Sequence, residues 1–218
     1  VGTIVDVSAT YESCEKVLTL AGKYPHVYAA IGVHPDEVGE LNEDKIQHMK
    51  ELCCNKKVVA VGEIGLDYYW DNEPWFIRQL ELAGEVKKPV IIHSREAAAD
   101  TMYIMKNYAQ GLDGVIHCYS YSREMAEEYV KMGFYIGIGG VVTFKNAKKL
   151  KDVAAAIPIE KIVLETDCPY MAPEPYRGKR NQSSYIQYVA EKIAELKEMS
   201  QEEVIAVTEK NARDLYGI

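Results

Sequence analysis

Short, almost continuously apolar runs alternate with longer amphipathic stretches along the whole chain, and this alternation limits the possible folds more than any other feature. Apolar runs rich in valine and isoleucine are typical of strands that are covered on both faces. They lie at Thr3–Val7, Val27–Val33, Val58–Gly62, Pro89–Ile92, Gly114–Ile116, Phe134–Ile138 and Ile162–Leu164. The helical patterns lie at Glu12–Lys23, Glu43–Leu52, Trp75–Lys87, Ala97–Tyr108, Arg123–Met132, Ala147–Ala156, Tyr185–Lys197 and Gln201–Tyr216. Strands and helices that alternate at this spacing predict parallel strands joined by right-handed crossovers.

Two parallel architectures fit this order, an open doubly wound sheet and a closed barrel. An open sheet of the dinucleotide-binding type needs a glycine-rich phosphate turn after an early strand. The first strand is instead followed by Ser-Ala-Thr-Tyr at positions 8–11, and the glycine-rich run at 137–140 comes late. We therefore predict a TIM (β/α)8 barrel, in a single domain over residues 1–218 because no linker divides the chain. Seven strand patterns are visible and Val1 already lies at a strand pattern, so the first barrel strand is expected to be missing.

Composition excludes several classes of protein. With 48% hydrophobic and 27% charged residues, the chain is not disordered or of low complexity. No apolar run is long enough to span a membrane, and no secretory leader is seen. Five cysteines without CxxC spacing indicate free thiols in a reducing cytoplasm. A formal net charge of -8 means that overall charge would not attract nucleic acid.

Ionisable side chains follow five different apolar runs. They are His34, Glu63, His93, His117 and Asp167. The carboxyl ends of the strands of a parallel barrel converge on one mouth, where active sites are built. Burying several imidazoles and carboxylates together is costly unless a partner such as a divalent cation pairs them. Imidazole and carboxylate suit Zn²⁺ and Mn²⁺, carboxylate-rich sites also suit Mg²⁺, and two ions bridged by one carboxylate would account for the mixture.

Other readings of the same residues are possible. A glycosidase pair of Glu63 and Asp167 would leave the histidines without a role, and no G-x-S-x-G nucleophile motif is present. Cys118 follows His117, and because adjacent strand residues point to opposite faces, Cys118 is expected to face the helices. Glu165 shares a face with Asp167, either as the partner of a metal ligand or as a turn residue.

Seven sequence blocks resemble the signatures of the TatD-type metal-dependent deoxyribonucleases, in the right order and over essentially the whole chain. They are Gly32–Pro35, Gly62–Asp67, Ile92–Arg95, His117–Ser120, Leu164–Tyr170, Pro175–Asn181 and Asn211–Arg213. The resemblance implies an amidohydrolase-type TIM barrel that hydrolyses DNA phosphodiester bonds, with two divalent metal ions (Mg, Mn or Zn) at its mouth.

The resemblance also assigns roles to the residues at the ends of the strands. Glu63 would bridge the two ions, His93 and His117 would hold one of them, and Asp167 would hold the other and help to activate the attacking water. His34 would contact the substrate phosphate or a bound water. The family's first strand carries His-x-His, which is absent here, and the chain is contracted near residues 72–75.

Candidate substrate-binding residues surround this site. Arg95 and the basic cluster of Arg177, Lys179 and Arg180 could grip backbone phosphates, although a basic cluster can also be a solvated turn. The aromatic run at 68–70 (Tyr68, Tyr69, Trp70) could stack on bases or cap the barrel core.

We therefore predict a cytoplasmic DNase, an exonuclease acting on single strands or ends, without a membrane partner. The alternatives are a metal-dependent hydrolase of a small ester, lactone or amide, and a catalytically impaired scaffold. The sequence does not define the oligomeric state.

Overall fold

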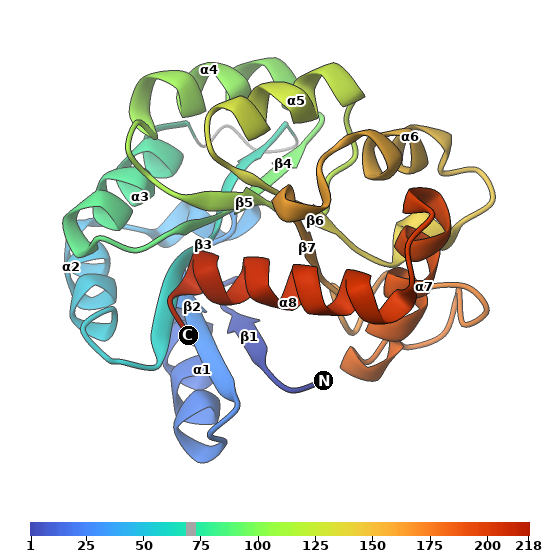
Figure 1. Cartoon of the computed structure of the whole chain (residues 1–218). Helices are drawn as coiled ribbons and strands as arrows, with labels where there is room; N and C mark the ends of the chain where they lie inside the picture. Colours follow the sequence, from blue (N-terminus) through green and yellow to red (C-terminus); the bar gives the residue numbers. More distant parts are fainter. Residues whose placement is uncertain (69–72) are drawn as a thin grey trace. The chain divides into compact units, whose positions relative to one another are not determined.

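The computed structural model describes residues 1–68 and 73–218, which form two compact units. The first unit comprises Val1–Gly114 together with Tyr216–Ile218, and the second comprises Val115–Leu215. Each unit shows the same alternation of strands and helices that the sequence predicts (Figure 1).

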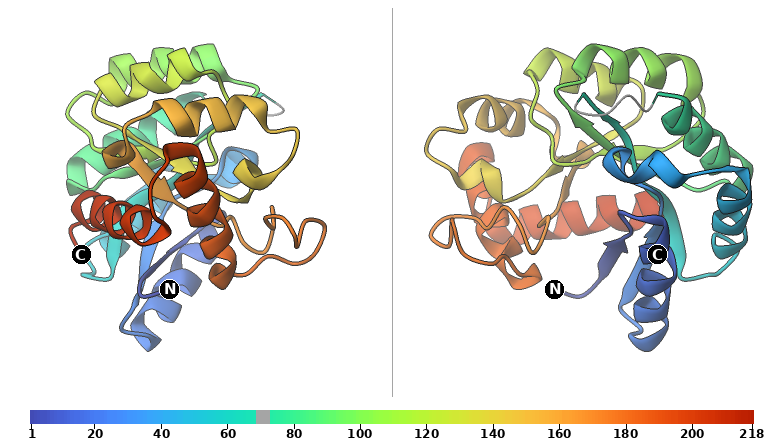
Figure 2. Two further views of the ribbon diagram at one scale, coloured as in Figure 1. Left: turned by 45° about the vertical axis from the view of Figure 1, so that its right-hand side comes forward. Right: turned by 180° about the vertical axis from the view of Figure 1, so that it is seen from behind.

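The strands of the first unit pair in parallel and follow chain order. They are β1 (Ile4–Val7), β2 (Val27–Ile31), β3 (Val58–Asp67) and β4 (Val90–Arg95). The helices of this unit are α1 (Tyr11–Lys23), η1 (Pro35–Glu40, a 3-10 helix), α2 (Glu43–Leu52), α3 (Glu73–Val86) and α4 (Ala98–Tyr108). Helix α1 packs on β2, the strand that follows it, and α3 packs on β3, the strand that precedes it, so both strands are covered by a helix that adjoins them in the sequence (Figure 2).

The second unit repeats this arrangement. Its parallel strands are β5 (Gly114–Ile116), β6 (Tyr135–Ile138) and β7 (Ile162–Leu164), again in chain order. Its helices are α5 (Arg123–Lys131), η2 (Gly140–Thr143), α6 (Lys148–Ala156), η3 (Ile159–Lys161), η4 (Ser183–Tyr185), α7 (Ile186–Lys197) and α8 (Gln201–Tyr216). Within each unit no strand order reverses, as it would at the switch point of a doubly wound sheet.

The local signals in the sequence set most element ends. Strands β5 and β7 and helices α2 and α8 have the predicted bounds. At the start of α8 the Ser200 N–H donates to Glu203 Oε2 at 2.9 Å, and the Glu203 N–H donates to Ser200 Oγ at 3.2 Å. This reciprocal pair is a capping box, which satisfies backbone donors that the first helical turn leaves open.

Strands β3 and β4 are longer than the apolar pattern predicts. The pairing shifts between Val61 and Ile64, where β3 carries one residue more than β4, and then continues to the pair Asp67–Arg95. Gly65 permits this continuation, because a Cβ there would lie 1.8 Å from the carbonyl oxygen of His93. Such a bulge redirects side chains, so Glu63 lies within a paired strand and not after its end.

All five cysteines are free thiols, as predicted, and burial raises the pKa of Cys53 to about 12. Among the described helices, none combines the length and the apolar character that a bilayer crossing requires.

Candidate metal centres

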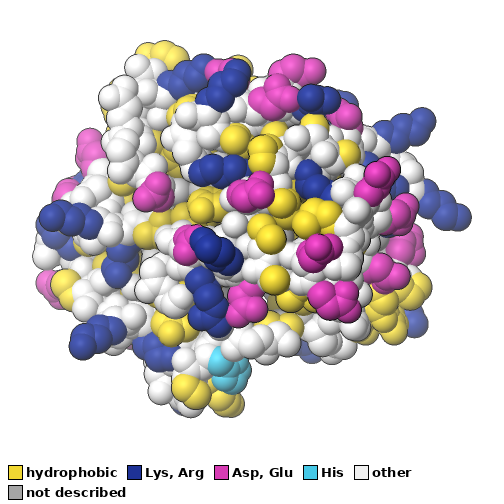
Figure 3. Space-filling view, viewed as in Figure 1, with side chains coloured by type: hydrophobic (Ala, Val, Ile, Leu, Met, Phe, Trp, Pro, Cys, Tyr) yellow, Lys and Arg dark blue, Asp and Glu magenta, His cyan; other side chains and the backbone are white. Residues whose placement is uncertain are grey.

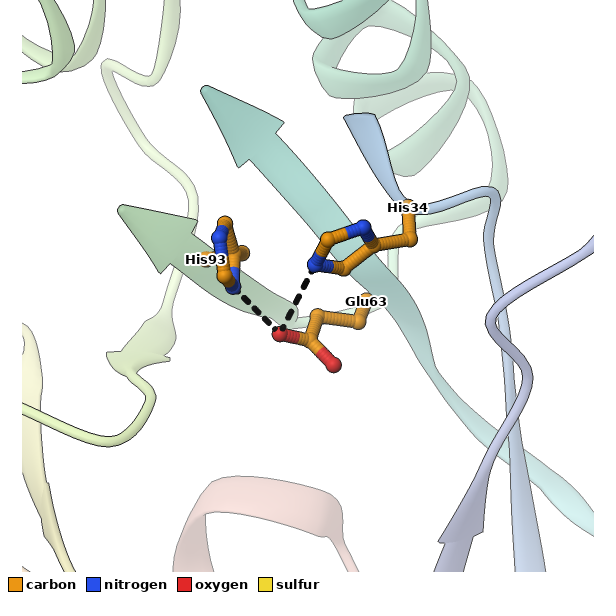
Figure 4. A group of neighbouring side chains, drawn as sticks. All are labelled: His34, Glu63 and His93. Carbon is orange, nitrogen blue, oxygen red and sulfur yellow. Dashed lines mark hydrogen bonds and ion pairs between the residues drawn. The ribbon is translucent and has the colours of Figure 1, made fainter. Parts of the chain in front are cut away.

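Three side chains of the first unit converge on one carboxylate oxygen. Glu63 Oε1 lies 2.8 Å from His93 Nδ1 and 3.8 Å from His34 Nε2. Figure 4 shows both rings directed at this oxygen, His93 from β4 and His34 from the segment after β2. The two imidazole rings meet edge to face, with centroids 4.2 Å apart. The structure therefore brings together three residues that the sequence analysis selected separately.

Two further carboxylates contact the imidazole nitrogens of His93 and His34 that point away from Glu63. Asp67 is fully buried, and its Oδ2 lies 3.4 Å from His93 Nε2 and 2.6 Å from a terminal nitrogen of Arg95. His34 Nδ1 contacts the carboxylate of Asp36. A carboxylate behind a ring nitrogen fixes the tautomer and the orientation of the imidazole. The opposite nitrogens, His93 Nδ1 and His34 Nε2, are therefore the ones directed at Glu63.

This donor set fits a divalent ion. Ligand atoms of His34, Glu63 and His93 all lie within 4.8 Å of one another and are partly buried. Atoms bound at about 2.1 Å to a tetrahedral ion lie about 3.4 Å apart, so small side-chain shifts would place these three around one ion. Two imidazole nitrogens and one carboxylate are ligands that Zn²⁺ and Mn²⁺ accept.

The second unit contains its own cluster. His117 directly follows β5, and Glu165 and Asp167 follow β7. Glu165 Oε2 lies 2.7 Å from His117 Nδ1, and Asp167 Oδ1 lies 3.8 Å from His117 Nε2. The ring of His117 thus has one carboxylate at each nitrogen. The sharing of one ion by His93 and His117 stays a prediction.

Two residues beside His117, Cys118 and Glu165, can now be compared with the predictions from the sequence. Cys118 was expected to face the helices, but β5 ends at Ile116, so strand alternation no longer applies. The Cys118 sulfur instead lies within 4.8 Å of the ligand atoms of His117 and Glu165. Of the two roles weighed for Glu165, the contact with His117 favours the partner of a ligand over a turn residue.

The predicted substrate-binding residues occupy different environments. Arg177, Lys179 and Arg180 are all exposed, and the guanidinium of Arg177 lies 4.1 Å from the ring centre of Phe144 in a cation–π contact. Arg95 is about half exposed despite its contact with Asp67. Tyr68 is exposed at the end of β3, while Tyr69 and Trp70 lie outside the described residues.

The loop that carries Asp167 is closed by a buried asparagine. The side-chain nitrogen of Asn181 donates to the carbonyl oxygens of Thr166 at 2.6 Å and Tyr170 at 2.7 Å. Asp167 itself adopts a left-handed backbone conformation, with φ of 53°. Neither Asn181 nor Asp67 was among the site residues predicted from the sequence, although both lie within blocks that carry the resemblance.

Comparisons with known proteins agree on one family. A family profile described as TatD related DNase matches residues 1–217. The uncharacterized metal-dependent hydrolase YabD of Bacillus subtilis is 46% identical over 222 residues, which cover 99% of this chain and 87% of YabD.

Solved structures agree with the sequence comparison. The crystal structure of YJJV, a TatD homologue from Escherichia coli K12, has a TM-score of 0.93 and 31% identity, covering 100% of this chain and 87% of that chain. An uncharacterized amidohydrolase from Saccharomyces cerevisiae shares the fold alone, with a TM-score of 0.85 at 18% identity, covering 98% of this chain and 88% of that chain. The predicted TIM-barrel type of fold is thereby confirmed.

Proposed function

Since this chain belongs to the TatD related DNase family and is a metal-dependent hydrolase, we propose that its substrate is DNA and that it hydrolyses phosphodiester bonds. The observation that carries the proposal is the convergence of His34 and His93 on one oxygen of Glu63. We further propose two divalent ions (Mg, Mn or Zn), held with help from His117 and Asp167, and exonuclease action on single strands or ends.

The residues of the two clusters have distinct tasks in this proposal. Divalent ions bound there would polarise a phosphate oxygen and lower the pKa of the attacking water. Asp167 accepts the proton of that water at a carboxylate oxygen, because it is the more exposed carboxylate beside His117. His34 Nε2 lies 3.8 Å from Glu63 Oε1, where it would contact a phosphate oxygen or a bound water. Asp67 and Asp36 keep the two rings of the first cluster in place.

Metal dependence is the direct test of this function. A 5′-labelled single-stranded oligonucleotide is incubated with the protein and Mg²⁺ or Mn²⁺, and the products are separated by length. We expect stepwise shortening that stops when a chelator removes the ions and returns when Mn²⁺ is added in excess. Cleavage that resists the chelator, or no cleavage with any of these ions, would contradict the proposal.

Basic side chains beside the Asp167 loop are proposed to hold the DNA backbone. Lysine, arginine, aspartate and glutamate are interspersed over the face in Figure 3, and the net charge is -8. Local contacts, not a general positive field, must therefore bind phosphates.

Replacing Arg180 with alanine is expected to weaken binding without affecting the chemical step. Each lost phosphate contact lowers the slope of log affinity against log salt by about 0.7 for a single strand. We expect KM to rise several-fold while kcat stays within about twofold, because the guanidinium binds ground state and transition state alike. Arg123→Ala, which removes an exposed arginine on α5, is the matched control. An unchanged salt slope in Arg180→Ala would exclude a phosphate contact.

A further inference from the structure

The two oxygens of Glu165 are both used for contacts around His117. We propose that Glu165 is a positioning residue, which fixes His117 with its proton on Nδ1 so that Nε2 is presented to the metal ion. Gly137 contributes to this positioning, because the absence of a side chain there leaves the space that the Glu165 carboxylate fills. The proposal rests on the proposed function only in taking His117 as a metal ligand.

The contacts determine which ring nitrogen carries the proton. Glu165 Oε2 lies 2.7 Å from His117 Nδ1, and Glu165 Oε1 accepts the Cys118 backbone N–H at 2.7 Å. An ionised carboxylate can only accept hydrogen bonds, so Nδ1 must donate. A neutral imidazole with its proton on Nδ1 has its lone pair on Nε2. This nitrogen points toward Asp167, with Oδ1 at 3.8 Å.

The fold builds a place for this carboxylate. The backbone N–H of Glu165 donates to the carbonyl of Ile138 at 3.2 Å, which fixes the chain after β7 beside the end of β6. A Cβ at Gly137 would lie 2.5 Å from Glu165 Oε2 and 3.1 Å from the carbonyl oxygen of Ile116. A Cβ at Gly139 would lie no closer than 3.5 Å to Glu165, which is an ordinary contact. Gly137, and not Gly139, therefore makes room for the carboxylate.

A glutamine at position 165 cannot replace the glutamate, although it has the same shape. The carboxylate accepts from two donors at once, the Cys118 N–H and His117 Nδ1. An amide has one accepting oxygen and one donating nitrogen. If its oxygen keeps the Cys118 N–H, its nitrogen faces Nδ1, and His117 must move its proton to Nε2. In Glu165→Gln the nitrogen that should bind metal is then protonated.

The tautomer can be measured without metal or substrate. The protein is labelled with ¹⁵N in its five histidines, and long-range ¹H–¹⁵N correlation spectra are recorded in a chelator. The His117 signals are assigned by their loss in His117→Asn. We expect His117 to be held with the proton on Nδ1 in the native protein, and to shift to the Nε2-protonated form or a mixture in Glu165→Gln. A native His117 that averages between tautomers would overturn the proposal.

Metal affinity provides the second readout. Mn²⁺ binding is measured by isothermal titration calorimetry, with circular dichroism as the check of folding. We expect Glu165→Gln to weaken Mn²⁺ binding 10- to 100-fold, the range found for residues that orient metal ligands. Gly137→Ala is expected to do the same, because the added methyl displaces Glu165 Oε2, the end of a flexible side chain, whereas the backbone carbonyl of Ile116 at 3.1 Å needs to shift by only a few tenths of an ångström. Glu160→Gln, at an exposed glutamate of η3, and Gly139→Ala are the matched controls.

The outcomes separate this inference from the proposed function. Loss of affinity in both Glu165→Gln and Gly137→Ala, with the controls unchanged, supports the positioning role even if the native protein does not cleave DNA. Affinity within about twofold of native in Gly137→Ala and Glu165→Gln would overturn it, even if the native protein is an active nuclease. Because Gly137→Ala keeps every functional group, it tests the positioning role should Glu165→Gln fold poorly.

Discussion

Asp167→Asn is expected to abolish DNA cleavage while leaving the fold unchanged. Asparagine has nearly the same shape as aspartate and tolerates the left-handed backbone of this position. It is neutral, however, so it binds a divalent ion weakly and cannot take a proton from water. The loss of this group should raise the barrier by about 4 kcal/mol, which corresponds to about a thousandfold in rate.

The measurement is the single-turnover rate on the labelled oligonucleotide, at saturating Mn²⁺ and at tenfold higher Mn²⁺. Because the missing group acts on the proton, more metal should not restore the rate. Asp152→Asn, at an exposed aspartate of α6, is the control for loss of one negative charge. A rate for Asp167→Asn within tenfold of native would show that Asp167 is not in the reaction.

Glu63→Gln is expected to have an effect as large, but through the affinity for metal. Glu63 carries the only negative charge among the three side chains that converge in the first unit, His34, Glu63 and His93. Glutamine has the same shape as glutamate, and the pairing of β3 with β4 is made by backbone groups, so this pairing should persist. Two neutral imidazoles and an amide bind divalent ions weakly, and we expect Mn²⁺ affinity to fall by at least about a hundredfold.

Cleavage by Glu63→Gln should fall by about a thousandfold at low Mn²⁺ and recover in part as Mn²⁺ is raised, in contrast to Asp167→Asn. The paired measurements are calorimetric Mn²⁺ binding and a metal titration of the cleavage rate. Glu81→Gln, at an exposed glutamate of α3, is the control. Native Mn²⁺ affinity in Glu63→Gln would exclude Glu63 as a ligand and would direct the search toward Asp167 and the second unit.

These variants also address the alternative of a small-substrate hydrolase. The clusters of His34, Glu63 and His93 and of His117, Glu165 and Asp167 suit hydrolysis of several bond types, because a divalent ion polarises a phosphoryl or a carbonyl oxygen alike. A native protein that binds Mn²⁺ through Glu63 yet leaves every oligonucleotide intact would favour an ester, lactone or amide as the substrate.

The order of elements was open to prediction because its causes are local. The apolar runs of β5 and β7 and the amphipathic pattern of α2 lie within a few residues, and their observed bounds match the pattern. The capping pair of Ser200 and Glu203 is equally local, being three residues apart. Histidines and acids after several apolar runs were visible in the same way, and they indicated a metal site before any distance was known.

The sequence by itself therefore determined the parallel β/α alternation, the barrel type of fold and the candidate residues for a metal site. Only the tertiary structure decided how these residues meet. The bulge before Ile64 extends β3 past Glu63, and it depends on pairing with β4 about 30 positions away in the chain. The partnership of Glu165 with His117 joins residues 48 positions apart. Periodicity reports which face of an element is apolar, whereas hydrogen bonds between distant strands select the rotamer and tautomer of each side chain, and these are the properties that turn a set of candidates into a site.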